Sequence, residues 1–489
     1  MTEEATTMIG DPPEPGDALP GFRLGVSRGL TYGVHTEPEV FLPEVRALGV
    51  RTVRVYLYWA QLEPEPGEFD WTAVDALLDQ LEDTDELWIT VYSTSTWATR
   101  HPNPTLPASA AEDPERYRRF LRELVSRCRG RVRFWQCDNE PCVNFLWNGS
   151  AAEYVRQLGI FGEVVRELDD GGLVVIGGVP PDALDGDEAD AEAVAYFDRI
   201  IRDGGAHFDV FDIHPYGDPY GIPAVVEAAH RALARHGLRK PVVIGEYNGP
   251  FPFAQPGLRP RLVGLWSGVQ EENGAGGAGE QLDEEWKRTG EPGMIALYRR
   301  MAVLPPLLQM FMVGCPPDLE DKRHRWNCRD LVVRNLLAFE AGVRRTVCWQ
   351  LAPERPGRRN PYKVMELLFG KFDLMDYQGD RLGRRYPAGE AMARLAERLG
   401  EVRKVSRIEV PGQPDLHLFE VDRVARGPML VAWERRGDFD GEDEPPTPFH
   451  HEWAASTARA MDALGAPVPI EVRDGRVHLP LTLTPVFIE

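Results

Sequence analysis

The sequence contains no apolar run approaching the roughly 20 residues that a transmembrane helix needs. It also has little positive charge: 55 lysines and arginines are set against 77 aspartates and glutamates, which gives a formal net charge of −22. A partner with a phosphate backbone would require clustered basic residues. We therefore expect no membrane partner and no nucleic-acid partner, while the sequence leaves the oligomeric state open.

Cysteine is scarce and irregularly placed. The six cysteines form no CxxC pair and share no regular spacing, which predicts reduced thiols and no disulfide framework. The neighbouring His450 and His451 have no carboxylate or cysteine at the spacing of metal ligands. The sequence thus predicts neither a metal site nor a cofactor.

The first twenty residues are acidic and rich in proline, and they lack the basic start and apolar core of a signal peptide. We expect residues 1–20 to be a flexible segment and the protein to be cytoplasmic.

From residue 21 to about residue 400, strand-like apolar runs alternate with amphipathic helical stretches, which is typical of a parallel sheet with helical crossovers. Eight βα units over this length predict a (β/α)8 TIM barrel. A doubly wound open sheet is the rival, but no glycine-rich phosphate loop follows the first strand. The expected strands lie at residues 22–30, 51–59, 86–97, 131–141, 172–181, 208–217, 240–250 and 345–353.

The regular spacing breaks between the seventh and eighth strands. Residues 251–328 form a long insertion that includes a loop over 315–328, and only then does a helix lead into the eighth strand. An insertion at this point emerges at the carboxyl face of a barrel, where it could wall a pocket. Its aromatic and histidine side chains are Phe251, Phe253, Trp266, Trp286, His324 and Trp326. We expect at least one of Phe253, Trp266 and Trp326 to lie near the two glutamates described below.

After residue 400 the helical periodicity gives way to short alternating runs separated by proline and glycine. This pattern predicts an antiparallel β-sandwich over 401–489. The runs begin at residues 402, 416, 428, 457, 468 and 476.

Two of the expected barrel strands end on a carboxylate. The run FWQCDNEP places Glu140 at the end of the fourth strand, and PVVIGEYNGP places Glu246 at the end of the seventh. A buried strand normally ends in turn residues, so the presence of a glutamate at the carboxyl end of each of these two strands calls for an explanation. Cleavage of a glycosidic bond supplies one, because it requires a carboxylic acid and a carboxylate on either side of the anomeric carbon.

Other polar side chains fall on the same faces of these strands. Alternation along a strand puts Arg54, Tyr56 and Tyr58 on one face, and Asp212, His214 and Tyr216 on another. A buried Arg54 needs a carboxylate partner, and Glu246 is the expected one, which would keep that glutamate ionised as a nucleophile must be. Asn139 could hold a sugar hydroxyl, and Trp349, Trp97 and Trp59 could offer flat faces to sugar rings, although such aromatics are equally often core residues.

At this point the sequence resembles the clan A glycoside hydrolases. Residues 53–71 are similar to the pattern of the second strand in that clan, DNEP to its acid/base motif and IGEYN to its nucleophile motif. The HPY on the sixth strand and Trp349 on the eighth also match. The β-sandwich and residues 367–400 before it look closest to glycoside hydrolase family 39 and its relatives.

The resemblance implies a role for each matching residue. Glu140 would be the acid/base and Glu246 the nucleophile, Asn139 would bind the 2-hydroxyl, and Trp349 would form the floor of the subsite. Arg54, His214 and Tyr216 would orient the nucleophile. The family implies net retention, for which the two carboxyl groups should lie about 5–5.5 Å apart. Cys142 and the residues after it depart from the polar stretch expected beyond the acid/base.

The function expected on these grounds is a retaining, exo-acting β-glycoside hydrolase, similar to a β-xylosidase or β-glucosidase. It would work by double displacement through a covalent glycosyl-enzyme on small glycosides or oligosaccharides. Two alternatives stay open: a catalytically silent carbohydrate-binding barrel, and a transglycosylase that uses the same residues.

Overall fold

The computed structural model describes residues 19–34, 37–185, 191–252, 255, 258, 298–353, 371–424 and 426–489. The segment expected over residues 1–20 lies almost wholly outside the described residues, as do Phe253, Trp266 and Trp286 of the insertion.

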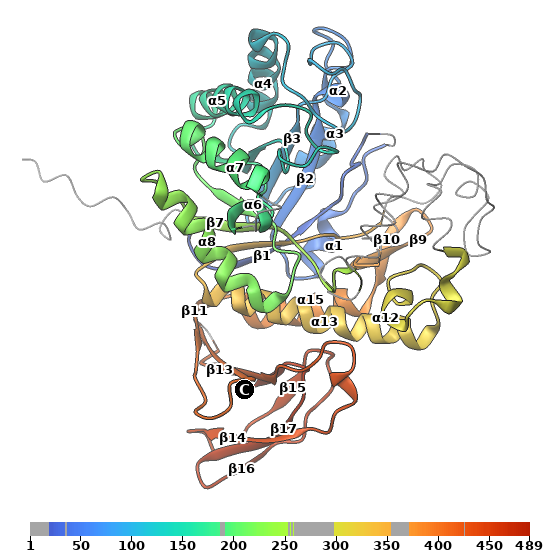
Figure 1. Ribbon diagram of the computed structural model, residues 1–489, viewed down its shortest axis with the longest axis vertical. Helices are drawn as coiled ribbons and strands as arrows, with labels where there is room; N and C mark the ends of the chain where they lie inside the picture. The colour runs from blue at the N-terminus through green and yellow to red at the C-terminus, as the bar shows by residue number, and fades with distance from the viewer. Residues whose placement is uncertain are drawn as a thin grey trace, which may run out of the picture.

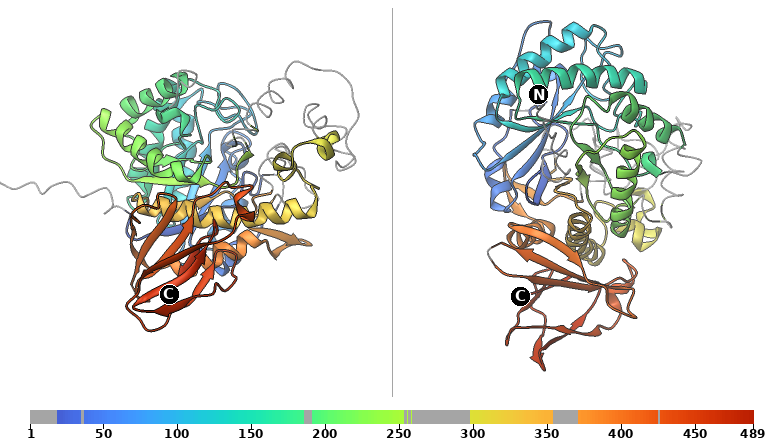
Figure 2. Two further views of the ribbon diagram at one scale, coloured as in Figure 1. Left: turned by 60° about the horizontal axis from the view of Figure 1, so that its bottom comes forward. Right: turned by 90° about the vertical axis from the view of Figure 1, so that its left-hand side faces the viewer.

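Eight parallel strands form a barrel (Figures 1 and 2). Their order in the sheet is β5-β4-β3-β2-β1-β8-β7-β6, and bridges from Val175 to Val210 and from Val179 to Ile213 join the two outer strands. The predicted (β/α)8 barrel is therefore confirmed. The strands are β1 (Arg23–Ser27), β2 (Thr52–Tyr58), β3 (Glu86–Tyr92), β4 (Val132–Cys137), β5 (Leu173–Val175), β6 (Phe211–Ile213), β7 (Val242–Tyr247) and β8 (Arg345–Cys348).

Helices surround the strands, as the right-hand view of Figure 2 shows. Local sequence sets their ends: the Asp113 side chain caps α4, and Ser150 with Glu153 forms a capping box at the start of α5. The strands β5 and β6 have three residues each, much shorter than the runs expected from the sequence. The helices up to β7 are α1 (Leu42–Ala47), α2 (Trp59–Leu62), α3 (Thr72–Leu78), α4 (Pro114–Cys128), α5 (Ala151–Leu168), α6 (Asp182–Asp185), α7 (Ala191–Gly204), the 3-10 helix η2 (Pro219–Gly221) and α8 (Ile222–Arg235).

The interior of the barrel changes character along its axis. One cluster is apolar and joins Trp88, Phe134, Val243 and Val347 with other buried side chains of the strands. Further toward the carboxyl ends the buried side chains are polar, beginning with the fully buried Arg54. The apolar layer fills the barrel, and the polar layer above it supports the carboxyl face.

The long helix before β8 corrects the sequence interpretation. Residues 315–328 were expected to be a loop, but α13 runs from Pro317 to Glu340, so most of this stretch is helical. Trp326 is only 2% exposed and packs with Tyr298, Phe311 and Phe372 in a separate hydrophobic cluster. Trp326 thus belongs to a cluster separate from the main core of the barrel. The prediction that at least one of Phe253, Trp266 and Trp326 lies near the two glutamates stays a prediction, because Phe253 and Trp266 lie outside the described residues. Two short helices precede α13: η4 (Met301–Val303) and α12 (Pro306–Gln309).

A hairpin and a helix connect the barrel to the C-terminal sheets. The strands β9 (Met375–Gln378) and β10 (Arg381–Arg385) form the hairpin, and α15 (Pro387–Leu399) follows it. In Figure 1, α13 and α15 lie between the barrel and the C-terminal strands, and α13 contacts α15 and β11.

The C-terminal strands form the predicted antiparallel β-sandwich, with one sheet in the order β11-β12-β13-β18-β15 and a second in the order β14-β17-β16. The strand β14 was missed in the sequence, because its PTPFHHE segment carries two prolines and two histidines. None of the helices in the described residues is long and apolar enough to cross a membrane. The sandwich elements are β11 (Val402–Arg407), β12 (Leu416–Arg423), β13 (Met429–Glu434), η5 (Gly441–Asp443), β14 (Thr447–Glu452), β15 (Ala460–Asp462), β16 (Glu471–Arg473), β17 (Arg476–Leu481) and β18 (Val486–Ile488).

Candidate active site

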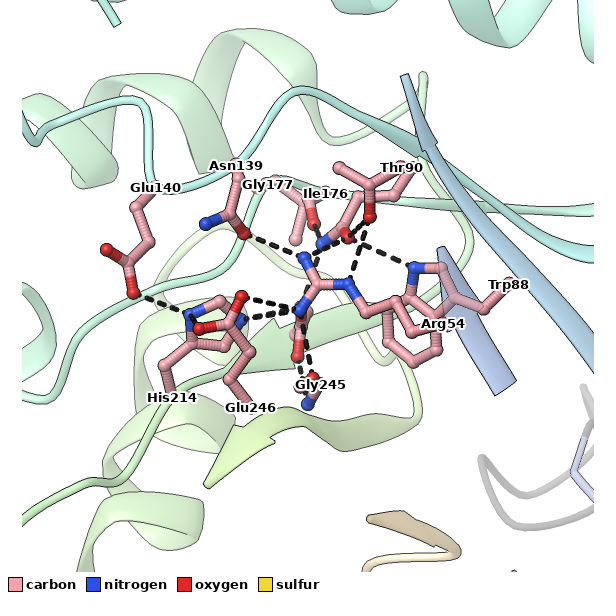
Figure 3. Close-up of polar contacts among 12 residues, drawn as sticks. Arg54, Trp88, Thr90, Asn139, Glu140, Ile176, Gly177, His214, Gly245 and Glu246 are labelled. Carbon is pink, nitrogen blue, oxygen red and sulfur yellow. Dashed lines mark hydrogen bonds and ion pairs between the residues drawn. The ribbon is translucent and has the colours of Figure 1, made fainter. Parts of the chain in front are cut away.

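The two strand-end glutamates meet at the carboxyl face of the barrel (Figure 3). Glu140 follows β4, Glu246 lies near the end of β7, and His214 follows β6. One carboxylate oxygen of each glutamate and one ring nitrogen of His214 all lie within 4.8 Å of one another. Three residues that are far apart in the chain, Glu140, His214 and Glu246, thus form one compact group of titratable side chains.

Glu246 is held on both oxygens. Its Oε1 accepts hydrogen bonds from Arg54 Nη1 at 2.9 Å and from the Tyr56 hydroxyl at 2.6 Å, and its Oε2 accepts one from the Tyr216 hydroxyl at 2.9 Å. Burial opposes the charge on this carboxylate, which is 6% exposed, but the charges of His214 and Arg54 outweigh it and hold the pKa of Glu246 below its usual value. The site therefore contains an ionised carboxylate in a fixed orientation.

Arg54 is the centre of the polar layer. Besides its ion pair with Glu246, it donates to the backbone oxygen of Gly245 at 2.9 Å, to Gln136 Oε1 at 2.6 Å and to Asn139 Oδ1 at 2.7 Å. Its guanidinium has 0% exposure and lies over the Tyr56 ring. Burial disfavours its charge, but the neighbouring Tyr56 and Glu246 raise the pKa of Arg54 above its ordinary value. The pairing of Arg54 with Glu246 that the strand pattern suggested is present.

His214 connects the two glutamates. Its Nδ1 lies 2.6 Å from Glu140 Oε1 and 3.7 Å from Glu246 Oε2, and its Nε2 lies 3.0 Å from Asp212 Oδ2. Burial lowers the pKa of His214, but the carboxylates of Glu246 and Asp212 outweigh that effect and raise it to about 10. A Cβ on Gly178 would lie 2.0 Å from the His214 ring, so a glycine is required there for the ring to fit. The imidazole is consequently cationic at neutral pH.

Further buried polar residues support this arrangement, and of these Gln136, Trp88 and Thr90 were not identified from the sequence. Gln136 Oε1 accepts hydrogen bonds from Trp88 Nε1 and the Thr90 hydroxyl, and its Nε2 donates to Asp212 Oδ2 at 2.8 Å. Asp212 also accepts from the Gly245 backbone nitrogen at 2.5 Å. The alternation along β2 and β6 put Tyr56 and Asp212 on the expected faces, but it did not indicate that Gln136 of β4 would contact Asp212 of β6.

Glu140 and Asn139 lie on a turn of unusual backbone geometry. The φ angles of Asp138 and Glu140 are 54° and 40°, in the left-handed region that residues other than glycine rarely adopt. The turn directs the side-chain amide oxygen of Asn139 toward Arg54 and the carboxylate of Glu140 toward His214. Because Arg54 occupies the amide oxygen of Asn139, the amide nitrogen is left as the donor for other groups.

Among the aromatic candidates, Trp349 and Trp97 have different surroundings. Trp349 packs edge-on against Tyr56, with ring centroids 5.7 Å apart, and its Nε1 has no hydrogen-bond partner within the described part of the chain. Trp97 instead packs edge-on against Trp59 and donates to the Glu63 backbone oxygen at 3.2 Å. No contact in the described residues joins Trp97 to either glutamate.

Among the described residues of the insertion, Phe251 reaches the site. The ring of Phe251 lies 5.3 Å from that of Tyr216, which holds Glu246. His324 is instead stacked on Tyr386, away from this group. Phe251 is therefore the described side chain through which the insertion contacts the active-site residues.

The trio of Glu140, His214 and Glu246 is also the one group in the described residues with the spacing of metal ligands. Arg54 already pairs with Glu246 there, so this carboxylate has a cationic partner within the chain. These side chains suit acid–base and nucleophilic chemistry.

The chain matches no protein-family model, and no curated protein has a similar sequence. Its fold is similar to solved structures of glycoside hydrolases over nearly its whole length. A family 39 glycoside hydrolase from the gut symbiont Bacteroides cellulosilyticus WH2 has a TM-score of 0.60 and 14% identity over 98% of this chain and 82% of that one. The family 39 (GH39) enzyme from Xanthomonas axonopodis pv. citri has a TM-score of 0.55 and 13% identity over 96% and 93% of the two chains.

A second family gives a likeness of the same degree. A family 51 α-L-arabinofuranosidase from Bifidobacterium longum has a TM-score of 0.56 and 13% identity, covering 99% of both chains. The resemblance suggested by the strand motifs is thus confirmed for the fold: a (β/α)8 barrel with a C-terminal β-sandwich, shared with glycoside hydrolases of families 39 and 51. At identities of 13–14%, what the chain shares with these structures is the fold.

Proposed function

We propose that this protein is a retaining β-glycoside hydrolase in which Glu246 is the nucleophile and Glu140 the acid/base. The observation that carries the proposal is the short separation of the two carboxylates: one oxygen of Glu140 and one oxygen of Glu246 lie within 4.8 Å of each other. Retaining enzymes hold the two groups about 5–5.5 Å apart, whereas inverting enzymes need about 6.5–9.5 Å to fit a water between them. The short separation supports double displacement.

The first step fits the environment of Glu246. Its ionised carboxylate attacks the anomeric carbon and forms a glycosyl ester, while the C–O bond to the leaving group breaks. Arg54, Tyr56 and Tyr216 hold both of its oxygens, so the carboxylate needs no reorientation before attack. The Asn139 amide nitrogen is the donor available for the neighbouring hydroxyl of the sugar.

Glu140 supplies the proton that leaves with the departing oxygen, and then removes one from the water that hydrolyses the ester. Its side chain is 16% exposed, which leaves it accessible to a leaving group. The cationic His214 is hydrogen-bonded to Glu140. A proton can therefore be held between Glu140 Oε1 and His214 Nδ1.

The roles of the two glutamates can be separated by leaving-group dependence. In a Glu140→Ala variant, kcat/KM for aryl glycosides with poor leaving groups should fall by roughly 10²–10⁴-fold, while activated leaving groups should be affected much less. Added azide should restore turnover of the activated substrates and give a β-glycosyl azide, identified by NMR. Equal losses across the substrates, or an α-configured product, would contradict the assignment.

The same substrates test the alternatives. A silent carbohydrate-binding barrel would turn over none of a panel of aryl β-glycosides of xylose, glucose, galactose and arabinose. A transglycosylase would divert product to an added acceptor alcohol at the expense of the free sugar. Exo-action on small glycosides remains a prediction, because most of the insertion residues on which it rested lie outside the described residues. Release of single sugars from the end of an oligosaccharide would support it.

A further inference from the structure

Asp138 is a buried carboxyl group beside the proposed acid/base that the chemistry above does not use. It follows β4, it has 0% exposure, and no cationic side chain in the described residues forms an ion pair with it. Burial raises its pKa to about 7. A buried carboxyl without a cation is costly, so its presence two residues before Glu140 requires an explanation.

Its hydrogen bonds give that explanation. Asp138 Oδ1 accepts from the backbone nitrogen of Ser93 at 2.7 Å, and Oδ2 accepts from the Ser93 hydroxyl at 2.7 Å. The Asp138 backbone nitrogen donates to the Val91 oxygen at 3.0 Å. Ser93 directly follows β3, so these three bonds attach the start of the catalytic turn to the end of the neighbouring strand.

The turn needs such an attachment because its backbone is strained. Asp138 and Glu140 both have positive φ, a conformation that is unfavourable for a residue with a side chain and is tolerated by aspartate better than by glutamate. On the far side, the Val143 backbone nitrogen donates to the Glu140 oxygen at 2.9 Å. The turn is therefore held before Glu140 by Asp138 and after it by Val143.

We propose that Asp138 is a positioning residue for Glu140: its paired hydrogen bonds to Ser93 hold the left-handed turn that aims the acid/base carboxyl at the leaving-group oxygen. The inference rests on the proposed function of Glu140. Asp138 acts through the backbone and does not touch the substrate. Its loss should therefore weaken proton donation to the leaving group more than it weakens nucleophilic attack by Glu246.

The test compares three variants on aryl glycosides that differ in leaving-group pKa. Asp138→Ala removes both acceptors, whereas Asp138→Asn keeps an oxygen for the Ser93 nitrogen and a polar group for its hydroxyl. Asp169→Ala is the matched control, because Asp169 is also buried and accepts two hydrogen bonds, from Trp135 Nε1 at 3.0 Å and from the Gly130 nitrogen at 3.2 Å. Asp169 lies beyond the opposite end of β4, away from the turn.

In Asp138→Ala, kcat/KM should fall about 10–100-fold more for the poorest leaving groups than for the best, the scale expected when a proton donor is displaced by about 1 Å. Asp138→Asn should recover most of this loss, and Asp169→Ala should affect all leaving groups equally. If Asp138→Ala does not fold, Ser93→Ala can replace it, because it removes one of the two hydrogen bonds. Its loss of kcat/KM should also be greater for poor leaving groups, but the difference between leaving groups should be smaller.

Two outcomes separate failure of this inference from failure of the proposed function. If Glu140→Ala shows leaving-group dependence but Asp138→Ala and Ser93→Ala lose activity uniformly, Asp138 is only a structural residue and the inference is overturned. If Glu140→Ala itself shows no such dependence, the proposed acid/base assignment fails, and the positioning role falls with it.

Discussion

At the amino end of the barrel Arg345 pairs with Glu86, and at the carboxyl end Arg54 pairs with Glu246. The first pair is bidentate: Arg345 Nε donates to Glu86 Oε2 at 2.6 Å and Arg345 Nη2 to Oε1 at 2.8 Å. The Thr52 hydroxyl also donates to Glu86 Oε2. The second pair has one direct contact, at 2.9 Å, and other carboxylates lie beside it. Both arginines are almost wholly buried.

The difference lies in what else surrounds each carboxylate. In the described part of the chain, the groups that contact the Glu86 carboxylate are all donors: Arg345, Thr52 and, at 3.6 Å, Arg23. Its negative charge is therefore offset by positive charge in the folded state. Glu246 shares its surroundings with His214, Asp212 and Glu140, so like charges are brought together in a small buried volume. Such crowding lowers stability and is typical of sites at which charges must move during a reaction. We infer that the amino-end pair stabilises the barrel, whereas the carboxyl-end pair serves the chemistry.

The sharpest test of this contrast removes the carboxylate charge at each end. Glu246→Gln should lower kcat by roughly 10⁴-fold or more, because an amide cannot form the glycosyl ester. Glu86→Gln should lower the melting temperature and leave kcat close to the wild-type value. Turnover of an activated aryl glycoside and thermal unfolding would be measured for both. A large loss of kcat in the Glu86 variant, or a small one in the Glu246 variant, would remove the contrast.

Removing each arginine should affect stability at both ends but activity at one. Arg345→Ala and Arg54→Ala each leave a buried carboxylate without its partner, at a cost of about 3–5 kcal/mol where desolvation is complete. The cost at Glu86 should be at the lower end, because its side chain is 14% exposed. Only Arg54→Ala should also reduce kcat/KM, since Glu246 and Asn139 lose their common anchor. Urea unfolding and kinetics would show whether the two effects separate as expected.

The two ends should also respond to opposite extremes of pH. The pKa of His214 is raised from 6.5 to about 10, so its stabilisation is complete below pH 6.5 and is lost as pH rises through about 10. Burial opposes the charge of Glu86, but Arg345 outweighs it and lowers the pKa of Glu86 below 4.5, so its stabilisation is present above that pH and lost in acid. Each pKa unit corresponds to about 1.4 kcal/mol.

Unfolding free energies measured from pH 3 to pH 10 would test both directions. The difference in unfolding free energy between wild type and His214→Gln should become smaller toward pH 10. The corresponding difference between wild type and Glu86→Gln should become smaller below pH 4.5. Differences that do not change with pH would show that neither group has the environment described above.

Comparison with the sequence shows which features local patterns can reveal. The eight apolar runs, the carboxylates that end two of them, and the inward face of β2 with Arg54 all follow from alternation and strand length. The long helix α13 was less readable, because its first half is strongly charged and its second half buries Arg329, Asp330 and Arg334 among apolar residues, so no single periodic pattern covers it. The strand β14 was not recognised in the sequence, because prolines within and before it argue against a strand.

The sequence by itself determined that two buried strands end on glutamates and that the barrel would bring strand ends to one face. Only the tertiary structure decided which side chains meet there: Tyr56 on Glu246, His214 between the two glutamates, and Ser93 on Asp138. These contacts join strands or loops separated by 45 to 190 residues, and they depend on the tilt and register of the closed barrel. A pattern of alternation fixes which face of a strand points inward, but the position of each side chain along the barrel axis is set by pairing with the neighbouring strands.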